Sequence, residues 1–346
     1  MPPYSLENRL VIGIASSALF DLAESDGVFR EEGEEGYRVY QRANLGNTLQ
    51  PGVAFPFIRR ILSLNDLNPE GDPLVEVIIL SRNDPDTGLR VMRSIESHGL
   101  PISRAVFMQG RAPYKFMRAL HMSLFLSADE GDVREAVGAG LPAGRVLGSA
   151  VADDPEDRDL RIAFDFDGVL AGDESERVFQ QGGMEGFRAH ETMNVATPHD
   201  AGPLRDFLRE INSLQRREEE RRREDEDYAI RVHVSIITAR SAPAHERAIL
   251  SLENWGVTVN DAFFLGGIDK SSIMDVLRPH IFFDDQKLHL EGTSRTTPSV
   301  HIPFGVVNQG ESGQEVSGQG ESGQGESPTI PRSRSTASRT PPAPST

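Results

Sequence analysis

The sequence contains an internal repeat. The segment VIILSRNDPDTGLRVMRSIESHGLPISRAVFMQG aligns without a gap with VSIITARSAPAHERAILSLENWGVTVNDAFFLGG, and Gly99 matches Gly256 at an offset of 157 positions (256 − 99). Further upstream, SSALFDLAESD aligns with FDGVLAGDESE. We therefore expect two copies of one unit, near residues 9–150 and 160–305, joined by the acidic linker VADDPEDRD at 151–159. The alternative is a chance similarity between two ordinary α/β units.

Short apolar runs alternate with amphipathic helical patterns in both copies. Val- and Ile-rich runs of this kind are typical of strands buried on both faces of a parallel sheet. The expected strands are Leu10–Ala15, Val75–Leu80, Leu160–Phe164, Val232–Ile237, Ala262–Leu265 and His280–Phe283, and helices are expected at Ala244–Asn254 and Lys270–Leu277. This alternation predicts a doubly wound α/β fold that binds its ligands at the carboxyl ends of the strands.

Composition excludes several classes of function. The 346 residues carry a net charge of −17, which argues against nucleic acid as a partner, and the absence of cysteine excludes disulfides and thiolate chemistry. No apolar run is long enough to cross a membrane and no signal peptide is recognisable, so we expect a cytosolic protein. Residues 306–346 are rich in Gly, Ser, Gln and Pro and are expected to form a disordered tail.

The second copy begins with the motif IAFDFDGVL, in which an apolar strand leads into Asp165, Asp167 and Gly168. Strand alternation places the two aspartates on the same side. Neighbouring carboxylates repel each other unless a cation lies between them, and oxygen ligands favour Mg²⁺. One such aspartate can attack phosphorus and form an aspartyl-phosphate. Taken alone, the motif also fits a strand end that merely caps a turn.

Three further pieces follow in chain order. Thr238, in IITAR, ends a strand at a helix start that can hold a phosphate. Lys270 opens a helical stretch and offers a fixed cation for phosphoryl oxygens. Asp284 and Asp285, in HIFFDDQ, end an apolar strand and are suited to completing a Mg²⁺ shell. Each also has a structural explanation (a helix cap, a surface lysine, a solvated strand end), but the four together indicate a phosphatase site.

This set resembles the four motifs of the haloacid dehalogenase-like (HAD) phosphohydrolases over residues 160–305. The stretches SSALFDL, PGVAFPF, LFLSADE, FDFDGVLAGDESERV, TARSA and RPHIFFDDQ are similar to the cytosolic 5′-nucleotidase I group, from about residue 10 to 305. The resemblance implies tandem HAD-like units with a parallel sheet, the first copy at 1–150 and the catalytic copy at 160–305. Phe166 stands where we expect Gly in animal members, and its side chain should point away from the site.

The resemblance also implies a mechanism. Asp165 would attack the 5′-phosphate of a nucleoside monophosphate (AMP, with IMP or a deoxynucleotide as alternatives), while Asp167 would protonate the leaving oxygen and later activate water. Thr238 and Lys270 would hold the transferring oxygens. Mg²⁺ would be bound by the four aspartates of the motifs, with Asp167 acting through its carbonyl oxygen and Asp285 beside the ion or acting through water. The expected substrate-binding residues are Gly168, Ala239, Arg240, Phe187 and His190.

The first copy lacks this chemistry. Its aligned residues are Ala15 for Asp165, Ser17 for Asp167, Ser81 for Thr238, Pro113 for Lys270, and Ser127-Ala128 for Asp284-Asp285. It should bind no Mg²⁺, and we interpret it as structural support or as a nucleotide effector site lined by Ser16, Ser17, Ser81 and Asn83.

Residues 171–231 of the second copy are predicted to form a small helical cap over the active site. Other readings of the whole chain also remain open. One is a phosphatase of another small phosphoester, a second is a nucleoside phosphotransferase, and a third is a non-catalytic nucleotide-binding scaffold. The oligomeric state is left open as well.

Overall fold

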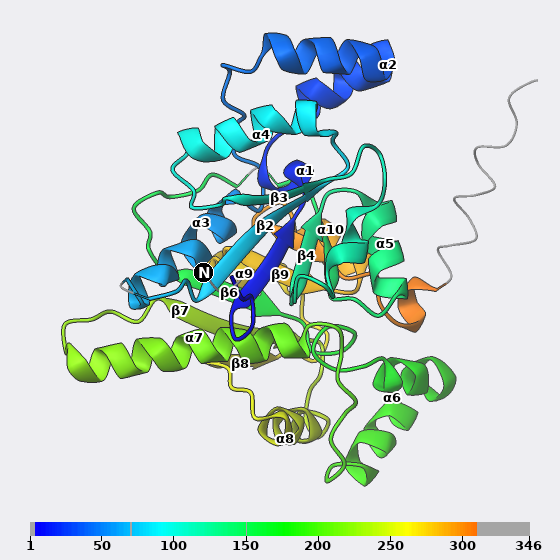
Figure 1. Cartoon of the computed structure of the whole chain (residues 1–346). Coiled ribbons are helices and arrows are strands. Elements are labelled where there is room, and N and C mark those ends of the chain that lie inside the picture. Colours follow the sequence, from blue (N-terminus) through cyan, green and yellow to red (C-terminus); the bar gives the residue numbers. More distant parts are fainter. Residues whose placement is uncertain (1–3, 70, 150, 310–346) are drawn as a thin grey trace, which may run out of the picture. The chain divides into compact units, whose positions relative to one another are not determined.

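The computed structural model describes residues 4–69, 71–149 and 151–309 (Figure 1). The described residues form one sheet of ten strands. The strands are β1 (Leu10–Ile14), β2 (Val75–Ser81), β3 (Arg104–Phe107), β4 (Leu124–Ser127), β5 (Ala143–Val146), β6 (Leu160–Phe164), β7 (Val232–Thr238), β8 (Asp261–Phe264), β9 (Ile281–Asp284) and β10 (Ser299–His301).

Helices connect these strands. They are α1 (Ser16–Leu19), α2 (Ala23–Ala43), α3 (Phe55–Ser63), α4 (Pro85–Ser97), α5 (Glu130–Gly138), α6 (Glu174–Met193), α7 (Arg205–Glu224), α8 (His245–Trp255), α9 (Ser271–Leu277) and α10 (Lys287–Thr293), with short 3₁₀ turns η1 (Leu64–Leu67), η2 (Pro113–Phe116) and η3 (Val306–Asn308). The predicted strands and helices fall on these elements within one or two residues. Among the described helices, none combines the length and the apolar character that a membrane span requires.

The strand order reads the same from either edge of the sheet. It is β3-β2-β1-β4-β5-β10-β9-β6-β7-β8, so each half has its strands in the order 3-2-1-4-5 counted along the chain. Every neighbouring pair is parallel except β5 and β10, which are antiparallel at the centre. The prediction of an α/β fold with a mostly parallel sheet is therefore confirmed. A single sheet running through both halves is a feature that the repeat did not predict.

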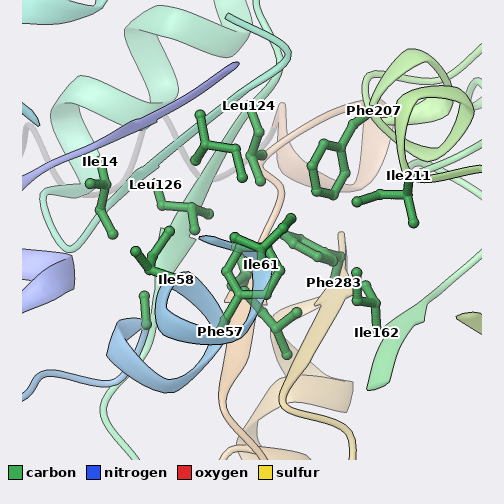
Figure 2. Packing of buried hydrophobic residues seen from close by; sticks show 14 of the residues in the cluster. Ile14, Phe57, Ile58, Ile61, Leu124, Leu126, Ile162, Phe207, Ile211 and Phe283 are labelled. Atoms are coloured by element: carbon green, nitrogen blue, oxygen red, sulfur yellow. The ribbon is translucent and has the colours of Figure 1, made fainter. Parts of the chain in front are cut away.

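One face of this sheet carries a hydrophobic core to which both halves contribute. Figure 2 shows Phe57 and Ile61 of α3 packed with Ile162 and Phe283 of the second half. Helix α3 contacts β6, and α7 contacts β1, so each half supplies a helix to the strands of the other. The opposite face has two separate clusters, one in each half. Because complete burial of a large apolar side chain contributes roughly 1.5–3 kcal/mol, this shared face joins the halves firmly.

The predicted cap at 171–231 is wrong in its extent. Helix α7 lies within that range, but Phe207, Leu208 and Ile211 on its apolar face are completely buried against the sheet. Its alternation of apolar and charged residues is that of a sheet-covering helix rather than a lid. Helix α6 is the remaining candidate for the predicted cap, and we call it the cap helix. It bends at Gly183, where φ is +61° and glycine is favoured.

The first half contains an equivalent of the cap helix, which the sequence analysis did not predict. Helix α2 bends at Gly33 with φ at +71°, and Gly33 aligns with Gly183 at an offset of 150 positions (183 − 33). The offset rises to 157 at β7 because α7, with 20 residues, is longer than its counterpart α3, with nine. Both halves therefore place a kinked helix after their first strand.

The boundary predicted for the tail also needs correction. Residues 306–308 form η3, and the buried Asn308 side chain donates a hydrogen bond of 2.9 Å to the carbonyl oxygen of Asp285. Residues up to 309 thus belong to the folded body, because they supply a partner to a strand-end carbonyl. The remainder of the predicted tail, 310–346, lies outside the described residues.

Candidate functional site

Two buried aspartates meet at the carboxyl ends of neighbouring strands in the second half. Asp165 follows β6 and Asp284 ends β9, and these strands pair in parallel with Phe164 opposite Phe283. The backbone N–H of Asp165 donates to the carbonyl oxygen of Phe283 over 2.8 Å. This bond fixes both carboxylates on one side of the sheet, as the motif spacing predicts.

Lys270 lies between these two carboxylates. Its Nζ is 3.1 Å from Asp165 Oδ1 and 2.6 Å from Asp284 Oδ2, and all three side chains are buried. Burial opposes a charge on the ammonium, but Asp165 and Asp284 outweigh that effect and raise the pKa of Lys270. The lysine therefore stays cationic, which its predicted role of holding phosphoryl oxygens requires.

The carboxylates themselves are strongly perturbed. Burial, with Asp284 and Asp167 as like-charged neighbours, raises the pKa of Asp165 to about 6. Burial and the same neighbouring acids raise the pKa of Asp285 well above its usual range. Asp284 differs: burial is outweighed by Lys270 and His289, which lower its pKa. One lysine does not neutralise this group of acids, so the site favours an additional cation.

The same residues fit a metal ion. Asp285 Oδ1 is a buried oxygen that accepts no hydrogen bond in the described part of the chain, and the buried Asp165 Oδ1 has the Lys270 ammonium at 3.1 Å. One ligand atom each from Asp165, Asp284 and His289 lie within 4.8 Å of one another. Carboxylate oxygens are the ligands of hard divalent cations. Asp165, Asp284, His289 and the adjacent Asp285 are thus the residues that can hold the metal.

Gly168 is required by the packing around the acids. Its φ is +71°, and a Cβ at this position would lie 2.3 Å from Asp285 Oδ2. Any side chain here would displace that carboxylate.

Thr238, at the end of β7, is buried, and its Oγ1 accepts a hydrogen bond of 3.2 Å from the N–H of Arg240. Ala239, between Thr238 and Arg240, is exposed.

The Asp167 carboxylate has a partner that the sequence did not predict. Its carboxylate accepts two hydrogen bonds of 2.7 Å from the Arg240 guanidinium, in a bidentate ion pair. Arg240 is buried beneath the Phe187 ring, whose centroid is 5.4 Å away, and over the Phe166 ring at 5.1 Å. The Phe166 side chain is fully buried and stacks on Trp255, away from the strand-end acids as expected.

Arg240 also connects this pair to the cap helix. Its Nη1 donates to Glu191 of α6 over 2.5 Å, and Arg247 of α8 donates to the other oxygen of Glu191 over 3.0 Å. His199 completes the contact, with its Nε2 at 3.1 Å from Glu191. The side chain of Glu191 is fully buried, so the end of α6 is anchored by charge to the strand that carries Thr238.

Two of the residues predicted to bind the substrate therefore contact other side chains of the protein. The Arg240 guanidinium is engaged by Asp167 and Glu191, and His190 lies 3.2 Å from Glu174 and 3.3 Å from Arg247. A role for Phe187 in holding a nucleoside stays a prediction, as do the roles of Gly168, Ala239, Arg240 and His190 in binding the substrate.

Sequence reasoning missed His289 and the anchor of the cap helix. His289 is a lone histidine on a helix, and nothing in its immediate sequence marks it. The anchor had a signal in the repeat: Glu191, Arg247 and Ser251 align with Gln41, Arg90 and Ser94, all buried polar residues. Aligning the copies through 171–231 would have revealed this group, because polar residues repeated at buried positions indicate a conserved internal contact.

A family model described as 5′-nucleotidase matches residues 2–309. The human (Homo sapiens) protein named cytosolic 5′-nucleotidase 1B is 33% identical over 298 residues, which cover 85% of this chain and 48% of that protein. The chain therefore spans about half the length of this relative.

Proposed function

The chain belongs to the 5′-nucleotidase family, and from this premise we propose that its second half hydrolyses nucleoside 5′-monophosphates with a divalent metal, most naturally Mg²⁺. The observation that carries the proposal is the buried group of Asp165, Lys270 and Asp284, with distances of 3.1 Å and 2.6 Å from the ammonium to the two acids. A nucleophile, a fixed cation and a metal-binding acid at adjoining strand ends are the requirements of phosphoryl transfer.

The first step forms a covalent intermediate on Asp165. One carboxylate oxygen attacks phosphorus, and the bond between phosphorus and the ribose 5′-oxygen breaks. Asp167 supplies the proton that the leaving oxygen gains, so the nucleoside departs neutral. Thr238 and Lys270 hold the phosphoryl oxygens during the transfer. When bound, a divalent cation near Asp165 and Asp284 supplies positive charge that offsets the charge of the phosphoryl group.

The second step restores the enzyme. Water attacks the phosphorus of the aspartyl-phosphate, Asp167 accepts the water proton, and inorganic phosphate leaves with Asp165 again a carboxylate. The bidentate pair with Arg240 holds the Asp167 side chain in one orientation, which suits the base of this second step. At the start of the first step, Asp167 carries the proton that the leaving oxygen gains.

The finer assignments rest on resemblance. From the motifs, we assign the fold to the HAD-like type and expect AMP to be the preferred substrate. We assign the location to the cytosol, following the name of the human relative. A sugar phosphate as substrate or a nucleoside as phosphate acceptor would use the same site. The inert-scaffold alternative is disfavoured by the buried acids, because an unused group of this kind carries a large desolvation cost.

A phosphate-release assay tests the proposal. The full chain is supplied with AMP, IMP, dAMP, CMP and two sugar phosphates, each with Mg²⁺ and with EDTA. We expect release from nucleoside monophosphates with Mg²⁺ and loss of at least 100-fold with EDTA. Activity confined to sugar phosphates would overturn the substrate class, and activity that survives EDTA would overturn the role of the metal.

A further inference from the structure

The first half contains a cavity at the position of the second half's site. Its volume is about 650 Å³, and it lies at the carboxyl ends of β1, β2 and β4. The residues predicted to line it, Ser16, Ser17, Ser81 and Asn83, all do so. Pockets that hold small organic ligands have volumes of roughly 300–1,000 Å³. This cavity is therefore large enough for a nucleoside.

The floor of the cavity has lost every charge that the second half uses. Neutral residues replace the four aspartates and Lys270, and Asn83 and Gln41 stand where the second half has Arg240 and Glu191. The backbone geometry is unchanged: the N–H of Asn83 donates to Ser81 Oγ over 3.1 Å, as the N–H of Arg240 does to Thr238. Ser16 and Ser81 form a hydroxyl pair at 3.0 Å. The floor offers neutral hydrogen-bonding groups and no cation.

The rim of the cavity is acidic. Asp84 and Asp129 are the N-caps of α4 and α5, and their carboxylates accept bonds of 2.7 Å from the N–H groups of Thr87 and Asp132. Helix N-termini of this kind otherwise attract phosphate. The second half has Ser241 and Gln286 at these positions, and no side chain caps α8 or α10 there.

Most charged side chains of the cavity form ion pairs within the protein. Arg82, the single basic residue of the lining, is bound by Asp132 in a bidentate pair at 2.7 and 2.9 Å. Arg38 binds Glu34 at 3.0 Å and also Asp84 of the rim at 2.8 Å. A phosphate entering this cavity would meet carboxylates and displace existing pairs, whereas a neutral ligand would not.

The aromatic part of the site is retained. Phe29 and Tyr37 of α2 line the cavity with their rings edge to face at 5.7 Å, and they align with Phe179 and Phe187 of α6. The Phe29 side chain is half exposed, which leaves a ring face open to a planar ligand. Stacking of a base on an aromatic side chain is worth about 1–3 kcal/mol. The Asn83 amide, near the Tyr37 hydroxyl, can pair with the polar edge of a base.

From this combination we propose that the first half binds an uncharged nucleoside, the product class of the reaction, and discriminates against nucleotides. The choice of a nucleoside rests on the proposed function, since Tyr37 aligns with Phe187, the ring expected to contact the substrate. The exclusion of phosphate rests on the rim and floor charges alone.

Calorimetric titration of the full chain tests this, with Asp165→Asn to prevent turnover and with adenosine, inosine, uridine and cytidine as probes. We expect at least one nucleoside to fill a site that Tyr37→Ala weakens at least tenfold. The matched variant Phe187→Ala should leave that site intact. AMP should fill one site, and Tyr37→Ala should not affect it. The proposal would be overturned if Tyr37→Ala left the binding of all four nucleosides unchanged. It would also be overturned if AMP bound the site that Tyr37→Ala weakens more tightly than the nucleosides do.

A gain-of-binding variant tests the charge argument separately. Asp84→Ser with Asp129→Gln introduces the second half's residues, and we expect AMP to bind the first site at least tenfold more tightly than before. Unchanged AMP affinity would refute the rim as the reason for discrimination. Thermal melting and phosphate release by the Tyr37→Ala chain with native Asp165 report whether that variant is folded. Failure of the proposed function would appear in the release assay and not in these isotherms.

Discussion

In the second half, the strand ends carry buried acids and a lysine beneath a neutral rim. In the first half, the strand ends are neutral beneath an acidic rim. The backbones of the two sites are nevertheless equivalent, with the same strand order and the same kinked helix after the first strand. On the two proposals above, the scaffold sets where a ligand lies, while a few charged side chains decide whether it is a phosphate.

The cost of each site differs as well. Burying Asp165, Asp284 and Asp285 is unfavourable unless cations compensate them, and the raised pKa values of Asp165 and Asp285 show that Lys270 compensates them only in part. The first half has no such cost, and its buried Ser16 and Ser127 need only ordinary hydrogen bonds. The site of the second half is thus a locally destabilised version of the same architecture.

The largest effect is expected from the nucleophile. Asp165→Asn should lower phosphate release by at least about 1,000-fold, because the amide cannot form the covalent intermediate. Adding Ala15→Asp to that variant should restore nothing, since the first half has Pro113 and Ser127 in place of the lysine and the second acid. Steady-state kinetics would measure both. Activity in the double variant would break the comparison between the halves.

The second-largest effect on phosphate release is expected when Lys270, which lies between Asp165 and Asp284, is removed. Lys270→Met is expected to reduce kcat by roughly 100- to 1,000-fold, because the phosphoryl oxygens lose their fixed cation. It should also lower the free energy of unfolding by about 3–5 kcal/mol without added metal, since two buried acids lose their partner. The control is the exposed Lys115→Met in the first half. Equal effects of the two substitutions in kinetics and urea unfolding would contradict the role of Lys270.

The anchor of the cap helix offers a smaller test. Glu191→Gln introduces the residue type of the first half, Gln41, and should cost about 3 kcal/mol of stability and about tenfold in kcat/KM, because Arg240 and Arg247 lose a charged partner. Burial opposes the charge, but His199 and Arg240 lower the pKa of Glu191 below its ordinary value of 4.5.

The sign of the pH effect follows from that lowered pKa. The stabilisation by Glu191 should be present above pH 4.5 and lost as the pH falls below it. Urea unfolding from pH 3.5 to 7 would measure this, with the exposed Glu220→Gln as control. A Glu191→Gln variant with an unchanged stability profile would remove the anchor from the comparison.

The smallest effect concerns His280, which aligns with Ser123. Burial, with Arg60 and Arg161 nearby, lowers the pKa of His280 to about 4. The unfolded chain, with a pKa near 6.5, then binds more protons between pH 4 and 6.5, so this group makes stability rise with pH in that window. Between pH 5.5 and 6.5, His280 should add about 1 kcal/mol or less to the rise in the free energy of unfolding. The His280→Ser variant should show a smaller rise over the same pH range. A steeper slope in the variant would contradict this assignment.

The sequence alone located the strand ends that matter. Apolar runs followed by Asp165, Thr238 and Asp284 predicted both the parallel sheet and the residues at its carboxyl edge, because buried strands need apolar residues on both faces. The repeat predicted the inert first half residue by residue. These inferences depend only on local pattern and on the order of residues along the chain.

The tertiary structure decided how these pieces combine. The antiparallel contact between β5 and β10 joins the halves into one sheet, and α7 became part of the shared core rather than a cap. The pairing of Asp167 with Arg240 and the approach of His289 to Asp284 are contacts between side chains on different elements. Such contacts depend on packing across the whole molecule, so local sequence patterns do not encode them.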